Sequence, residues 1–172
     1  MAKKLFFLIL FGIAFGFVEA AVVFYLRLLL HYNSGYLQDG YKVLLNIGFI
    51  AFVYPSKPIL QTAQVTLAET VREFATIIML ISVSYLSAKY LLQRVGAFLI
   101  SFALWDIFYY VFLRLLTGWP KSLFDTDIYF LIPVAWIGPI ITPLIISSLL
   151  FILGTALYVL PGTIITKQFI SK

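Results

Sequence analysis

The run from Val95 to Leu116 is long and apolar enough to cross a bilayer, yet it holds an aspartate, Asp106, near its middle. A helix of about 20 residues spans the hydrocarbon core of a membrane, and an ionised side chain at that depth costs several kcal/mol. Such carboxylates usually face a protein interior or a water-filled cavity. The run therefore predicts a membrane protein with a buried polar site.

The composition favours this class over a water-soluble one. Hydrophobic residues make up 63% of the chain and charged residues 11%, whereas soluble domains are about half apolar and a quarter charged. The 172 residues predict a single integral-membrane domain, residues 1–172, with the lipid bilayer as its partner. The net charge of +5 does not indicate nucleic-acid binding, because the basic residues gather at the ends of apolar runs and not along one face.

The predicted fold class is all-α, a polytopic transmembrane helix bundle of about four spans. Apolar runs place these spans at roughly residues 5–30, 69–92, 95–116 and 139–160. Two further apolar segments, 43–54 and 128–136, are too short to span. We expect both to be interfacial or re-entrant, and for 43–54 the sequence leaves open whether it re-enters the membrane or lies on its surface.

Local signals predict where the helices begin. Thr66 and Glu69 fit a capping box at the start of the second span. Asp127 can cap a short helix that begins at Ile128, and Pro139 suits an early position in the fourth span. In the first span, small residues recur every four positions and give a face that another helix can approach closely: Gly12, Gly16 and Ala20.

The basic residues predict the orientation. With four spans both termini lie on one side, together with six basic residues and no acid: Lys3, Lys4, Lys89, Arg94, Lys167 and Lys172. By the positive-inside rule, we expect a multi-pass protein of the inner (plasma) membrane with cytoplasmic N- and C-termini. The loops of the other side hold three lysines, Lys42, Lys57 and Lys121. Adding Arg27, Arg72 and Arg114 at the adjoining helix ends would bring the two sides level at six basic residues each.

The candidate site consists of acids and arginines at mid-membrane or nearer the outer face. Three carboxylates are candidate catalytic groups, since a desolvated carboxylate can act as a general acid or base: Asp106, Glu19 and Glu73. Four side chains are candidates for substrate binding, where guanidinium groups suit phosphate: Arg114, Arg72, Arg27 and Tyr110. Glu69, within the predicted cap, is expected to be structural.

Spacing relates these residues to one another. Asp106, Tyr110 and Arg114 lie at i, i+4 and i+8, along one slowly drifting stripe of a helix. Asp106 and Arg114 are two turns apart and cannot touch along a straight helix. We predict that Glu19 and Asp106 project into one shared interior with Arg114 near its mouth. An internally satisfied, purely structural Asp106 is an equally open alternative.

Three functions fit this pattern. The first is binding or processing of a lipid-borne or extracytoplasmic substrate. The second is a non-catalytic small subunit or assembly partner of a larger membrane complex. As for partners besides the bilayer, the sequence leaves open another membrane protein or a homo-oligomer. The third, ion or proton translocation, ranks last because the inner half of the bundle lacks ionisable residues away from its ends. Whether the chain is an enzyme stays open.

Several kinds of chemistry have no motif in this sequence. The chain has no cysteine and a single histidine, so thiolate metal sites and the di-metal carboxylate pattern of helical bundles are absent. No phosphate-binding loop, dinucleotide fingerprint or serine nucleophile motif occurs. We therefore expect no metal and no cofactor.

The segments WDIFYY, GWPKSL and FLIPVAWIGP, which begin at Trp105, Gly118 and Phe130, resemble a family of small uncharacterised bacterial integral-membrane proteins. The segments EAAVVFYLR and ETVREFATIIML fit the same pattern. The resemblance covers most of the chain outside residues 33–65. It implies a membrane helix bundle and no particular activity.

Overall fold

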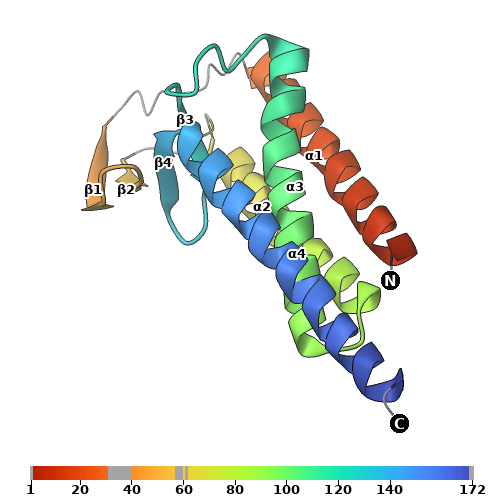
Figure 1. Ribbon diagram of the computed structural model, residues 1–172. Coiled ribbons are helices and arrows are strands. Elements are labelled where there is room, and N and C mark those ends of the chain that lie inside the picture. Colours follow the sequence, from red (N-terminus) through yellow and green to blue (C-terminus); the bar gives the residue numbers. More distant parts are fainter. Residues whose placement is uncertain (1, 31–39, 57–59, 61, 171–172) are drawn as a thin grey trace.

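Four helices make up most of the chain in the computed structural model, which describes residues 2–30, 40–56, 60 and 62–170, with Leu30 and residues 160–170 in backbone only. The helices are α1 (Ala2–Leu30), α2 (Ala63–Ser87), α3 (Leu91–Thr117) and α4 (Ile141–Ile170). Figure 1 shows the N and C ends of the chain toward one end of the helices, and the strands toward the other.

Three of these helices are long and apolar enough to cross a membrane. Among the described residues they are Ala2–Leu29, Leu91–Thr117 and Ile141–Val159. The predicted second span, 69–92, corresponds to α2, but α2 lies outside this group. Its first half carries Glu69, Arg72 and Glu73, which lower its mean hydropathy.

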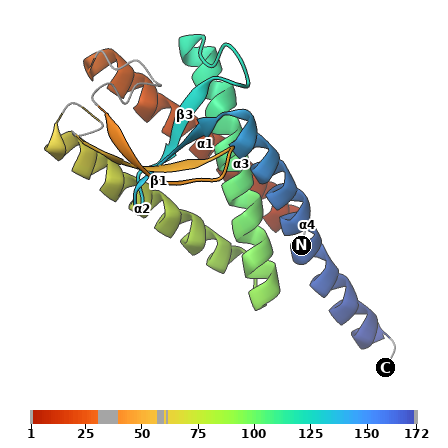
Figure 2. The ribbon, with the colours of Figure 1, turned by 90° about the vertical axis from the view of Figure 1, so that its left-hand side faces the viewer.

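The prediction of an all-α fold is wrong in one respect, because the helices are accompanied by a four-stranded antiparallel sheet. Its strands are β1 (Tyr41–Asn46), β2 (Ala51–Pro55), β3 (Thr126–Phe130) and β4 (Ala135–Pro139), in the spatial order β1-β2-β4-β3. Figure 2 looks onto the strands, which lie in front of the helices between α2 and α4.

The two short segments predicted as interfacial or re-entrant, 43–54 and 128–136, are parts of this sheet. Each belongs to a hairpin, and the hairpins join where β2 pairs with β4, with Phe52 opposite Trp136. Both segments are rich in β-branched and aromatic residues and are bounded by turn residues, which is the pattern of a strand. The length of the two segments shows that neither can span a membrane, but it does not distinguish a strand from a short helix.

The first hairpin turns at Gly48, whose φ of 91° lies in the left-handed region that favours glycine. The backbone N–H of Ile47 donates to the carbonyl of Ile50 at 3.0 Å, and that of Gly48 donates to the side chain of Asn46 at 2.8 Å. These bonds fix the tight connection between β1 and β2.

The predicted helix starts are corrected at three places. α2 begins one turn earlier than the capping box implies, with Thr62 as its N-cap, whose hydroxyl accepts from the Val65 N–H at 3.2 Å. Asp127 lies within β3 and caps no helix, and Pro139 ends β4. α3 ends at Gly118, a left-handed C-cap whose N–H donates to the Arg114 carbonyl at 2.8 Å.

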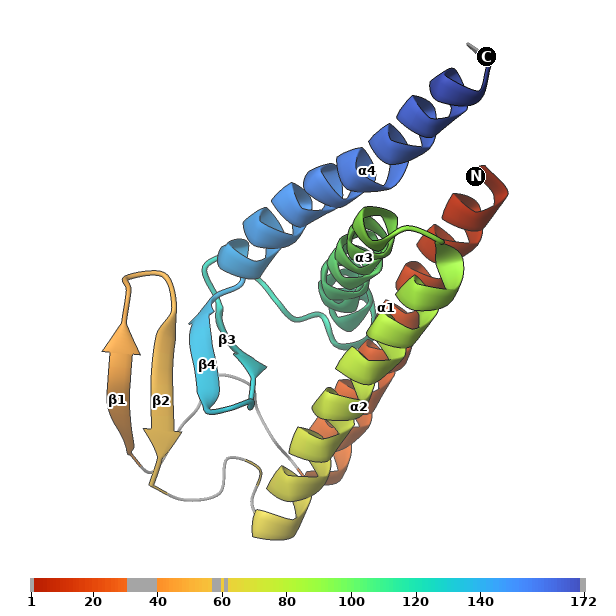
Figure 3. The same ribbon diagram turned by 90° about the horizontal axis from the view of Figure 1, so that it is seen from below.

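α3 is the central helix. Figure 3 shows it between α4 on one side and α1 with α2 on the other. The predicted close approach along the small residues of α1 is confirmed, because a Cβ atom added at Gly16 would lie 2.9 Å from the Trp105 carbonyl of α3. Ala97 and Ile100 of α3 are fully buried. This close packing holds α1 against the half of α3 that carries Asp106.

Candidate functional site

A pocket lies between α1, α2, α3 and β3. It encloses about 800 Å³ of empty space, counting its open mouth. Seven charged side chains line it: Glu19, Arg27, Glu69, Arg72, Glu73, Asp106 and Asp127. Four aromatic side chains line it as well: Trp105, Tyr109, Tyr110 and Tyr129. Polar and aromatic side chains from distant parts of the sequence thus surround one space.

The structure brings six of the seven predicted site residues to this pocket. Glu19 and Asp106 line the same interior, together with Glu73, Arg72, Arg27 and Tyr110. Arg114 is the exception: its side chain is exposed and donates a hydrogen bond to the Pro120 carbonyl. Two helical turns carry Arg114 past the pocket, where it closes the turn after α3.

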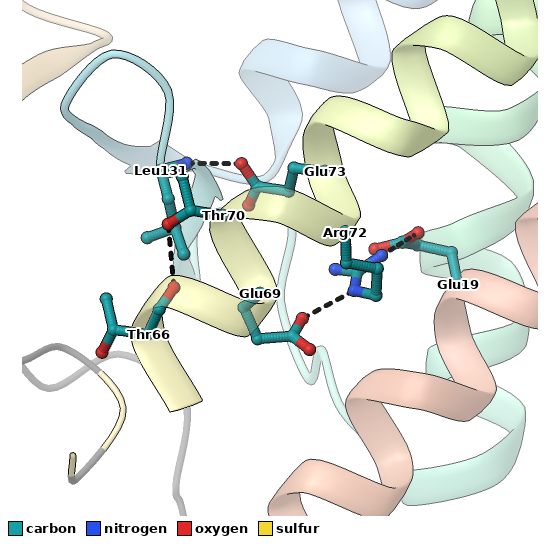
Figure 4. A network of polar contacts seen from close by, with 7 residues as sticks. All are labelled: Glu19, Thr66, Glu69, Thr70, Arg72, Glu73 and Leu131. Atoms are coloured by element: carbon teal, nitrogen blue, oxygen red, sulfur yellow. Dashed lines mark hydrogen bonds and ion pairs between the residues drawn. The ribbon is translucent and has the colours of Figure 1, made fainter. Parts of the chain in front are cut away.

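Arg72 joins two carboxylates. Its guanidinium contacts Glu19 of α1 at 2.6 Å and Glu69, one turn earlier in α2, at 2.7 Å (Figure 4). Glu19 is buried, with 8% of its surface exposed. The partner of Glu69 is Arg72 and not the helix terminus that the capping box predicted, and its expected structural role stays a prediction. This three-residue contact holds α1 against α2.

Glu73 faces the sheet, and Figure 4 shows it pointing away from Arg72 toward the end of β3. Its carboxylate accepts a hydrogen bond from the backbone N–H of Leu131 at 2.9 Å. The carboxylate therefore joins α2 to the turn between β3 and β4, and no cation is its hydrogen-bond partner among the described residues.

Asp106 accepts a hydrogen bond from the Ser147 hydroxyl of α4 at 2.7 Å. It also lines a second pocket of about 460 Å³, whose other walls are mostly apolar: Ile50, Phe102, Phe130, Trp136, Pro143 and Ile146. Tyr129 is the other residue common to both pockets. A polar and an apolar pocket therefore share a wall.

Asp127 lies in β3 with 5% of its surface exposed. Its carboxylate accepts a hydrogen bond from the Tyr110 hydroxyl at 3.1 Å. Burial raises the pKa of Asp127 from 3.8 to about 6, against the opposing effects of the Arg27 charge and the Tyr110 hydrogen bond. This carboxyl group therefore changes its protonation state close to neutral pH.

Two donors at the pocket have no acceptor in the described part of the chain. The Nε of Arg27 is buried and unpaired, while its guanidinium lies 4.3 Å from the centre of the Trp119 ring. The indole N–H of Trp105 is also buried without an acceptor. Buried donors of this kind are rare in proteins and call for an explanation.

Trp105, Asp127 and Tyr129 are pocket residues that the sequence did not predict. Asp127 was interpreted as a helix cap because 128–136 was expected to be helical. Asp127, Tyr129 and Leu131 alternate along the chain, and all three line the pocket. That two-residue period is typical of one face of a strand and is the signal that would have identified them.

Comparisons with known protein families, with curated proteins and with solved structures find no match to this chain. The resemblance to a family of small bacterial membrane proteins therefore stays a prediction.

Proposed function

We propose that this chain is a multi-pass protein of the inner membrane whose polar pocket binds or processes a lipid-borne or extracytoplasmic substrate. One observation carries the proposal: in a chain with 11% charged residues, five carboxylates and two arginines line a single pocket. Keeping charged groups inside an apolar bundle is costly, and a site for a polar ligand accounts for that cost.

The proposed orientation places both termini in the cytoplasm and the pocket on the outer side. It is supported by the basic residues at the helix ends opposite the sheet, namely Lys3, Lys4, Lys89 and Arg94. The pocket is lined by the later half of α1, the first half of α2 and the later half of α3, all toward the sheet.

The second pocket supports a lipid-borne substrate over a purely soluble one. It adjoins the polar pocket at Asp106 and Tyr129 and is walled mainly by aromatic and aliphatic side chains. An amphiphile can place its polar group in one pocket and an apolar part in the other. In the membrane that apolar part exchanges contacts with lipid chains for contacts with the apolar walls of the second pocket.

The substitution Asp106→Asn tests this function. We expect the variant to accumulate and unfold like the parent while losing the small molecule retained through mild detergent extraction, measured by mass spectrometry. Asp125→Asn is the matched control, because the Asp125 carboxylate accepts from the Lys121 and Ser122 backbone outside the pocket. An Asp106→Asn protein that retains the same molecule and fully replaces the parent in cells contradicts the proposal.

A second candidate function, assembly partner of a larger membrane complex, is favoured by β1. Every residue of this edge strand is exposed, including Val43, Leu44 and Leu45. An open apolar edge can pair with a strand of another chain. Gentle extraction should then give a discrete hetero-complex, whereas a stable assembly of this chain alone contradicts it.

A further inference from the structure

The charges of the polar pocket are unbalanced. Five carboxylates face two guanidinium groups, and one of these, Arg72, is engaged by both Glu19 and Glu69. Arg27 makes no ion pair or hydrogen bond within the described part of the chain. The remaining side of the pocket therefore has a surplus of negative charge.

Three carboxylates on that side hydrogen-bond only to neutral donors. Glu73 accepts from a backbone N–H, Asp106 from a serine hydroxyl and Asp127 from a tyrosine hydroxyl. A neutral donor satisfies one lone pair of an ionised carboxylate without balancing its charge, and an incompletely balanced desolvated charge is unfavourable. The Arg27 charge favours ionised Asp127 but forms no ion pair with it among the described residues. The three groups come from α2, α3 and β3 and line one cavity, so a cation that enters it would meet a negatively charged wall.

The surrounding walls favour an organic ammonium group as that cation. Trp105, Tyr109, Tyr110 and Tyr129 line the pocket beside the acids, and aromatic faces attract ammonium groups through their ring electrons. Within the described residues, no three His, Cys, Asp or Glu side chains are grouped as a bound metal ion would require. The aromatic walls and the absence of such a grouping among the described residues favour an organic ammonium group over a metal ion.

The two unpaired donors of the pocket indicate that the ligand carries a hydrogen-bond acceptor near its ammonium group. Trp105 lines the pocket with 6% of its surface exposed, and its indole N–H has no acceptor among the described residues. The buried Nε of Arg27, also on the lining, has none either. A ligand that carries a phosphate or carbonyl oxygen near its ammonium group would satisfy both donors.

We propose that the ligand is a lipid whose head group carries an ammonium group beside a phosphate or carbonyl oxygen. The ammonium group lies on the side of the polar pocket that Glu73, Asp106 and Asp127 line, and the apolar part enters the second pocket. This inference rests on the proposed substrate-binding function of the same pocket and adds the charge of the substrate. The two arginines alone would favour a phosphate group. An ammonium group beside the phosphate also explains why the pocket holds five carboxylates.

Three probes test it on the purified full-length protein in detergent, by the change in tryptophan fluorescence on titration. They are short-chain phosphatidylethanolamine, phosphatidylglycerol with the same chains, and phosphoethanolamine without chains. We expect phosphatidylethanolamine to bind at least about tenfold more tightly than either of the others, a ratio equal to about 1.4 kcal/mol. Glu73→Gln should weaken its binding about tenfold without weakening that of the anionic phosphatidylglycerol, while Asp125→Asn should alter neither.

Trp105→Phe serves as a second variant, because it keeps the ring and removes the unpaired N–H. Because this variant lacks the tryptophan of the polar pocket, its binding is measured by mass spectrometry of the lipid retained in detergent. It should retain less of both lipids, and retention of both equal to that of the parent overturns the assignment of an acceptor. Equal affinity for the two lipids overturns the ammonium assignment. The proposed function survives that result, because the pocket could still bind a substrate with a different charge. Phosphoethanolamine binding as tightly as the full lipid overturns the lipid source. If no probe binds and Asp106→Asn retains full cellular function, the proposed function fails as well.

Discussion

Asp106 of α3 and Ser147 of α4 are joined by a hydrogen bond of 2.7 Å, and this bond lies where the polar and apolar pockets meet. Ser147 is 1% exposed, so its hydroxyl is removed from solvent. The bond therefore links the carboxylate of the candidate site to the packing of two long helices.

Ser147→Ala should destabilise the protein more than Asp106→Asn. The alanine leaves the carboxylate without its donor, and an unsatisfied buried acceptor costs about 1–3 kcal/mol. The asparagine still accepts the serine hydrogen bond and removes the charge. Thermal unfolding in detergent measures both, with Ser148→Ala as the control, since Ser148 is exposed and bonds only within its own helix. The reverse order of stabilities would contradict this.

Arg72→Gln should lower the free energy of unfolding by about 2 kcal/mol, because it leaves the buried Glu19 without its counter-charge. Removing one partner of a fully buried pair costs about 3–5 kcal/mol, and we take less because the Arg72 side chain is 26% exposed. In a double-mutant cycle, Glu19→Gln should cost clearly less when Arg72 is already glutamine. Additive effects of the two substitutions would show that the contact contributes nothing.

Binding of phosphatidylethanolamine should weaken by about tenfold between pH 7 and pH 5. The pKa of Asp127 is raised to about 6, chiefly by burial, so the fraction of ionised carboxylate falls about tenfold over that range. The titratable and charged groups that act on it or are acted on by it are Arg27, Asp106, Tyr109, Tyr110 and Tyr129. Titrations at several pH values measure the effect, and Asp127→Asn should reduce it.

In the absence of lipid, the free energy of unfolding depends on pH in the opposite direction from lipid binding. A carboxyl group whose folded pKa lies above its unfolded value binds more protons in the folded state, so its contribution to stability falls as pH rises from about 4 to about 6. Asp127 alone accounts for a decline of about 3 kcal/mol over that window. Lipid binding that strengthens as pH falls would contradict the ammonium assignment.

Gly16→Leu should disrupt the packing of α1 on α3. A Cβ atom at this position lies within 2.9 Å of both the Phe108 Cβ and the Trp105 carbonyl, and overpacking of this kind costs about 1–3 kcal/mol or more. Ala14→Leu, on an exposed part of the same helix, should leave the unfolding temperature nearly unchanged. Equal effects of the two substitutions would show that the helices do not approach closely at Gly16.

Cysteine labelling in intact cells tests the proposed orientation, since the chain has no cysteine of its own. Ser122→Cys and Tyr90→Cys lie beyond opposite ends of α3, and both positions are exposed. A membrane-impermeant reagent should label position 122 and should label position 90 only after the cells are broken. The reverse pattern would place the pocket on the cytoplasmic side.

The helices and the grouping of Glu19 with Asp106 could be predicted because both follow from one-dimensional patterns. Apolar length sets the helices, and the cost of isolated carboxylates in apolar runs predicts a shared interior. The sheet could not be predicted by the same reasoning, since a twelve-residue apolar segment excludes a span and leaves strand and helix open. Because β3 was not predicted, Asp127 and Tyr129 were not expected to line the pocket. Arg114 was included because its i, i+4, i+8 spacing with Asp106 and Tyr110 predicts that the three share one face of a helix. The spacing does not predict how far along the helix the pocket extends.

The pairing of β2 with β4 has a consequence for the order in which the protein forms. Between these neighbouring strands the chain makes all of α2 and α3, so closing the sheet requires contact across about 80 residues of sequence, a separation that slows folding. A growing chain carries Glu19, Arg72 and Asp106 long before it carries β3. These charged side chains therefore enter the bundle before Asp127 and Tyr129 can complete the pocket wall. During synthesis we expect them to be solvated by water or paired with one another. Truncation before residue 126 would leave the acids without the wall that makes them a site.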